Sequence, residues 1–146
     1  MEEKQRLKVH GSFVGVLCKE DGTVTTTRKD NMILNCGYDF IADAIGKATG
    51  RPAPMTKIAV GSNDGNTYEG LTGLRQQIMA KSATYQHIAG TKVFSLTTKF
   101  EKGEATGAIY EAGVCGDGGF LDRVTFPVVN KGANDTYEAT FTFTMR

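Results

Sequence analysis

The sequence has no tryptophan, only three prolines and two histidines, and no long apolar run. Its longest apolar stretch, Phe13 to Cys18, covers six residues and contains Gly15, whereas a membrane-spanning helix needs about 20 apolar residues. The N-terminus is charged, and no apolar run follows it. We therefore predict no signal peptide and no membrane span, and expect a soluble protein that is not secreted by the ordinary route.

Cysteine is also scarce, with Cys18, Cys36 and Cys115 far apart in the chain. An odd number at this spacing excludes a disulfide framework and a CxxC metal knuckle, so we expect reduced and mostly buried thiols. The chain also has no excess of either charge, because 17 Lys and Arg residues are balanced by 16 Asp and Glu residues. A nearly neutral protein has no net positive potential that would attract nucleic acid or an anionic membrane.

The chain is instead rich in glycine and threonine, with 18 residues of each among 146. Glycine is typical of turns and threonine of strands, which indicates a turn-rich β protein. This length fits one domain, 1–146, which begins with a polar N-terminal arm at 1–7. We predict a mainly β fold, an antiparallel β-sandwich or a flattened barrel.

Individual segments support this fold class. Residues 8–18 have apolar side chains on both sides, which indicates a strand buried between two layers, and Glu20-Asp21-Gly22 is typical of a hairpin turn. The strongest pattern is the C-terminal strand 136–145, in which apolar side chains alternate with threonine. Its inward face is expected to consist of Tyr137, Ala139, Phe141, Phe143 and Met145.

Two segments have helical character. In 37–47, Tyr38, Ile41, Ala42 and Ile45 repeat with the period of one face of a short amphipathic helix, and Asn35 precedes them as an N-cap. Residues 72–79 allow a second short helical turn that buries Leu74 and Ile78.

The histidines and the glycine-rich and acidic loops form no catalytic or ligand-binding motif. His10 and His87 lie in predicted strands and are interpreted as structural. Ser62 to Glu69 lacks the spacing of a calcium loop, and Gly116 to Gly119 lacks the Lys-Ser/Thr of a phosphate loop, so both are interpreted as turns. We predict no catalytic, cofactor-binding or metal-ligating residues.

Carboxylates offer the one alternative to this interpretation. Glu101, Glu104, Glu111 and Asp122 are candidates for a glycosidase pair. Glu111 lies in the otherwise apolar segment 108–114, where a carboxylate usually has a buried partner, and Arg123 is the candidate. We favour a structural ion pair over catalysis, with cell-wall hydrolysis through Glu111 as the enzymatic alternative.

Four segments, in order along most of the chain, resemble a family of small structural proteins of tailed bacteriophages. The resemblance is carried by Val9 to Phe13 with Asn31 to Ile45, by Ile58 to Gly61 with Leu71 to Leu74, by Ile109 to Val114, and by Leu121 to Phe126 with Val129 to Gly132. The chain departs from the family's pattern at Asp30-Asn31, where Lys-Asn is usual, and at Ser62, where a second glycine is usual.

The resemblance implies a non-enzymatic virion protein without a cofactor, assembled in the host cytoplasm. Its implied partners are other virion proteins, either the major capsid protein or tail and baseplate proteins, and repeated copies of itself. We predict a capsid decoration or cement subunit, with a tail, collar, baseplate or fibre-attachment protein as the alternative. A host-glycan-binding module using loops 48–56, 62–70 and 116–119 is a further alternative, in which Tyr68 is the only tyrosine or tryptophan.

Overall fold

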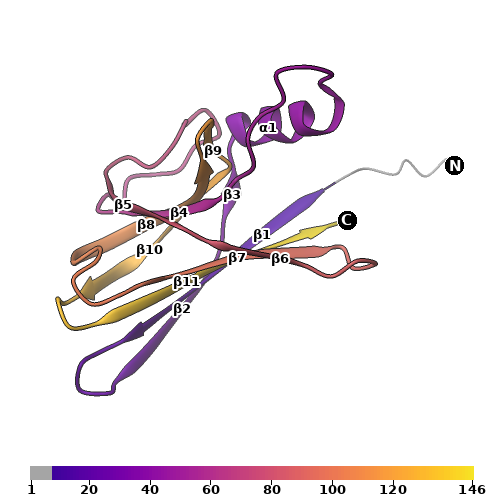
Figure 1. The fold of residues 1–146 in the computed structure, drawn as a ribbon. Coiled ribbons are helices and arrows are strands. Elements are labelled where there is room, and N and C mark those ends of the chain that lie inside the picture. Colours follow the sequence, from indigo (N-terminus) through magenta and orange to yellow (C-terminus); the bar gives the residue numbers. More distant parts are fainter. Residues whose placement is uncertain (1–7) are drawn as a thin grey trace, which may run out of the picture.

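The computed structural model describes residues 8–146, so the predicted arm at 1–7 lies outside the described residues. Two antiparallel sheets face each other, and one helix lies at one end of the pair (Figure 1). This arrangement confirms the β-sandwich, and because the sheets do not close on each other it is not a barrel.

The first sheet has five strands in the order β2-β1-β11-β7-β6. Their bounds are Val24–Asp30 for β2, Val9–Cys18 for β1, Thr136–Met145 for β11, Val93–Phe100 for β7 and Thr84–His87 for β6. The second sheet has the order β3-β10-β8-β4-β5, and β9 pairs with β8. Their bounds are Met32–Ile33 for β3, Asp122–Lys131 for β10, Gly107–Gly116 for β8, Lys57–Gly61 for β4, Gln77–Ser82 for β5 and Gly119–Phe120 for β9.

Strand β11 is central in the first sheet, hydrogen-bonded to β1 on one side and to β7 on the other. Its predicted inward face is confirmed for Tyr137, Ala139, Phe141 and Phe143, which are fully buried in the core between the sheets, whereas Met145 at the strand end is half-buried. Phe13 of β1 stacks there on Phe126 of β10, with ring centroids 5.1 Å apart. Aromatic contacts across the two layers thus hold the sandwich together.

Strand β1 differs from the prediction in how it is buried. Only the face that carries Phe13 and Leu17 enters the core, whereas Val14 and Val16 on the other face are half-buried. The half-burial comes from neighbouring side chains in the same sheet and not from a covering layer. The predicted turn after β1 is confirmed, with Gly22 at a φ of +90° that favours glycine.

The predicted helix is confirmed as α1, Asn35–Gly46. The prediction of its cap was wrong, because Leu34 is the N-cap residue and no side chain caps the helix. The predicted face was also wrong. Tyr38 and Ile45 are exposed, since the direction of packing is set by Gly37, which lies against the start of β10.

The second helical turn predicted at 72–79 does not form. The chain is irregular up to Gln76, and the following residues form strand β5, in which Met79 pairs with Val60 of β4. Pairing along β4 satisfies the backbone groups of this segment, and Gly73 weakens the competing helix. Ile78 is consequently exposed instead of buried.

Gly37 gives a direct test of how α1 is seated. A Cβ atom on Gly37 would overlap the carbonyl oxygen of Leu121, which is backbone and cannot rotate away. We expect Gly37→Ala to lower the free energy of unfolding by about 1–3 kcal/mol, measured by urea denaturation. Gly46→Ala is the matched control, because a Cβ there meets open space. Equal stability of the two variants would show that α1 is not held at this contact.

Candidate functional site

The outer face of the second sheet carries a buried ion pair, as predicted for Glu111 and Arg123. Glu111 lies on β8 and Arg123 on the adjacent strand β10, and Nε of Arg123 donates to Oε1 of Glu111 at 2.8 Å. Both side chains are completely buried. Two charges removed from water in this way require further hydrogen bonds to offset their desolvation.

Those hydrogen bonds come from the loop that joins β4 to β5. The carboxylate of Glu111 accepts the backbone N–H groups of Arg75 and Gln76, each at 2.8 Å, and of Asn63 at 3.2 Å. With the arginine included, four donors surround one carboxylate. Glu111 therefore presents no oxygen to solvent.

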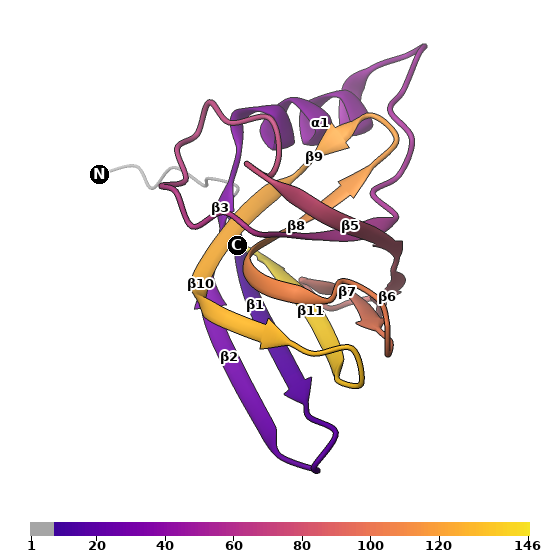
Figure 2. The ribbon, with the colours of Figure 1, turned by 90° about the vertical axis from the view of Figure 1, so that its left-hand side faces the viewer.

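The guanidinium of Arg123 holds the earlier part of the same loop. It donates to the carbonyl oxygens of Gly65 and Asn63, at 2.8 and 3.1 Å, and to the hydroxyl of Thr67 at 2.6 Å. Residues 62–76 are thus held against the outer face of the second sheet. They also reach the start of α1, where the backbone N–H of Asn35 donates to the carbonyl oxygen of Glu69 (Figure 2). The ion pair fixes a long loop in place.

The other candidate carboxylates belong to separate networks. Glu104 accepts from Nζ of Lys81 at 2.6 Å, and this contact lowers its pKa. Asp122 precedes Arg123 on β10, so its side chain points to the opposite face of the sheet from the ion pair. The structure does not bring Glu111 and Asp122 together as a glycosidase pair.

Asp122 is fully buried like Glu111, but no cation among the described residues pairs with it. Burial raises its pKa to about 8, although hydrogen bonds from the N–H of Val114 and the side chain of Asn31 act the other way. Asn31 leaves its own Oδ1 as a buried acceptor without a partner. If the side-chain amide of Asn31 is flipped, its Oδ1 faces Asp122 and accepts a hydrogen bond from the hydroxyl of the protonated carboxyl group.

The remaining candidate side chains lie apart from one another. His10 is near Asp30, at 3.4 Å, and Nδ1 of His87 lies 2.9 Å from the carbonyl oxygen of Val93. The cysteines are free, as predicted, but only Cys115 is buried, whereas Cys18 is exposed. No cluster of three or more metal-ligating side chains occurs within residues 8–146.

Two of the three loops predicted for the glycan-binding alternative meet at the end of the sandwich that carries α1. A pocket of about 360 Å³ is lined by Pro52 and Ala53 from one loop, by Gly118 and Gly119 from another, and by α1. Tyr68 is not part of this lining, because it lies beneath the guanidinium of Arg75, 5.7 Å from the ring centroid. The stacking aromatic is therefore separate from the pocket.

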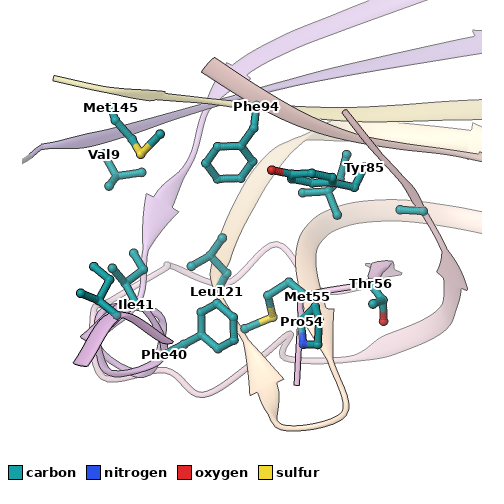
Figure 3. A pocket seen from close by; sticks show the side chains of 13 residues that line it. Val9, Phe40, Ile41, Pro54, Met55, Thr56, Tyr85, Phe94, Leu121 and Met145 are labelled. Atoms are coloured by element: carbon teal, nitrogen blue, oxygen red, sulfur yellow. The ribbon is translucent and has the colours of Figure 1, made fainter. Parts of the chain in front are cut away.

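A larger cavity, of about 540 Å³, lies between α1 and the first sheet (Figure 3). Its walls come from α1, from the segment before β4, from strands β1, β6, β7 and β11 of the first sheet, and from Ala83 and Leu121 next to strands of the second sheet. The residues that line it are Val9, Phe40, Ile41, Ile45, Pro54, Met55, Thr56, Ala83, Tyr85, Phe94, Leu96, Leu121 and Met145. Sequence reasoning missed this cavity, because its residues are scattered over the chain and form no local motif.

The outer face of the first sheet carries ordered rows of mostly small side chains, which continue on β2 to the charged Arg28 and Asp30. By strand register, Val14, Thr140, Thr97 and Thr84 form one row across four strands, and Ser12, Thr142, Ser95 and Gln86 form the next. The hydroxyls of Thr97 and Thr140 lie within hydrogen-bonding distance, at 3.2 Å. None of the described elements covers this face (Figure 1), in contrast to the outer face of the second sheet.

Comparisons of the chain with models of protein families, with curated proteins and with solved structures found no match. No helix within residues 8–146 is long and apolar enough to cross a membrane.

Proposed function

We propose that the protein is a non-enzymatic structural subunit of a tailed-bacteriophage virion, and specifically a capsid decoration subunit. The observation that carries the proposal is the uncovered outer face of the first sheet, where rows of mostly threonine, serine and valine cross four strands and continue to Arg28 and Asp30 on β2. The virion setting rests on the four segments of sequence that resemble small phage structural proteins. A tail or baseplate subunit is the alternative, and it would use the same face.

The outer face is suited to packing against another protein. Threonine and valine have few rotamers to lose on contact, and threonine adds a hydroxyl for hydrogen bonds across an interface. Five strands about 4.8 Å apart, with 4 to 10 residues each, give an area on the order of 600 Å². Stable protein interfaces bury about 800 Å² of accessible surface per partner, so this face is close to the required size.

A low loss of side-chain entropy favours contact with any protein and does not identify the partner. The test therefore places a charge at the centre of the outer face. Thr142 lies between Ser12 and Ser95 in the register of the sheet. We expect Thr142→Lys to fold normally, because the side chain points away from the core. Its binding to virions that lack the wild-type subunit is expected to fall at least tenfold, since an interface would have to desolvate the ammonium group.

The matched control is Thr106→Lys, which makes the same substitution at an exposed position outside the outer face. Copies bound per particle are counted by quantitative mass spectrometry after both variants pass a denaturation test. Unchanged binding of Thr142→Lys would overturn the assignment of the outer face as the interface.

A further inference from the structure

The cavity beneath α1 is too large and too apolar to be an ordinary packing defect. Leu96 and Leu121 of its lining are buried. Phe94, Met55 and Met145 are half-buried and lie around the cavity (Figure 3). Ile45 and Tyr85 lie at the mouth, 74% and 62% exposed. Protein interiors are normally packed without voids of this size, and its volume is within the range of about 300–1,000 Å³ found for ligand pockets.

Water is a poor occupant of this cavity. A buried water needs two to four polar partners, yet the lining side chains offer only the hydroxyls of Thr56 and Tyr85. Both residues are exposed, and the other lining side chains are hydrocarbon or thioether. Apolar cavities of about 150 Å³ in other proteins stay dry and bind benzene.

We propose that this cavity is a binding site for a neutral amphiphile with a single aliphatic chain, such as a fatty alcohol. The chain lies between α1 and the first sheet, and the uncharged head group stays at the mouth beside Thr56 and Tyr85. This proposal rests on the cavity alone and is independent of the proposed role in the virion.

The chemistry of the lining selects both parts of this ligand. Met55 and Met145 have flexible, polarisable side chains that adapt to a chain of irregular shape. Within residues 8–146, the lining contains no lysine, arginine, histidine, aspartate or glutamate. A carboxylate or phosphate head would therefore lose hydration without gaining an ionic partner, which favours a neutral head.

The experiment is a titration of the full chain with 1-octanol, followed by NMR of ¹³C-labelled methionine methyl groups. Met55 and Met145 line the cavity, whereas Met32 and Met79 do not and serve as internal references. We expect saturable shifts of the Met55 and Met145 signals, with the reference signals unchanged. Octanoate is expected to bind at least tenfold more weakly than the alcohol.

Two variants assign the binding to the cavity. Ala83→Leu fills the cavity and is expected to weaken octanol binding at least tenfold, whereas Ala89→Leu makes the same change at an exposed turn and is expected to bind like the wild type. Ile45→Ser, at the exposed mouth, avoids the core and is also expected to weaken binding. Linear, non-saturating shifts of Met32, Met55, Met79 and Met145 alike would overturn the proposal. Equal binding of octanoate would overturn the neutral head group.

Discussion

Arg123→Met is expected to lower the free energy of unfolding by about 3–5 kcal/mol, a large share of the stability of a small domain. It removes the partner of Glu111 and leaves a carboxylate buried without a cation. It also removes the donors that hold Asn63, Gly65 and Thr67. We therefore expect both lower global stability and release of the loop 62–76.

Two measurements separate these effects. Urea denaturation gives the free energy of unfolding, and limited proteolysis with trypsin reports exposure of the Arg75 peptide bond in the loop. Arg28→Met, at an exposed position on β2, is the matched control and is expected to change stability by less than about 0.5 kcal/mol. If Arg123→Met unfolds and is cleaved like Arg28→Met, the ion pair does not hold the loop.

The variant Glu111→Gln/Arg123→Met refines this prediction. It removes the unpaired charge along with its partner, so part of the lost stability is expected to return. The amide N–H groups of Asn63, Arg75 and Gln76 still lose their carboxylate, and the loop is therefore expected to remain sensitive to trypsin.

The second large effect is a fall in stability as the pH rises from about 5 to 8. Well below pH 3.8 the carboxyl of Asp122 is protonated in both the folded and the unfolded chain. Between its unfolded pKa of 3.8 and its folded pKa of about 8, the unfolded chain releases a proton that the folded chain keeps. Because the folded state binds more protons, the free energy of unfolding decreases by up to about 1.4 kcal/mol per pH unit in this range.

Asp122→Asn tests this assignment directly. An asparagine keeps the shape of the side chain, accepts from the N–H of Val114 and has nothing to ionise. In urea denaturation from pH 5 to 8.5, we expect the variant to be nearly insensitive to pH and more stable than the wild type at pH 8. Asp64→Asn, in the exposed part of the loop, is the matched control and should keep the wild-type profile. A wild-type profile for Asp122→Asn would contradict the buried, neutral acid.

The elements that could be predicted from the sequence are those whose pattern is long and local. The alternation in 136–145 runs over ten residues, so it identified both the strand β11 and its buried face. The helix α1 was predicted for the same reason, but not the direction in which it packs. That direction depends on the close approach of Gly37 to Leu121, a contact between segments far apart in the chain.

The buried ion pair was predicted because a carboxylate in an apolar strand needs a partner. Its role could not be predicted, because three of the four donors to Glu111 are backbone amides of the loop, which every sequence possesses. The helical turn expected at 72–79 failed for a related reason. Local propensity was outweighed by pairing of β5 with β4, and the sequence gives no sign of that pairing.

The central claim is that the protein is a decoration subunit bound to the capsid through the outer face of its first sheet. The most direct test of this proposal is a reconstruction of phage particles purified from the source of this sequence, supported by gold-labelled antibody. We expect density for the sandwich on the head, with Thr140 and Thr142 turned towards a neighbouring capsid protein. Label confined to the tail, or no label on any particle, would contradict the claim.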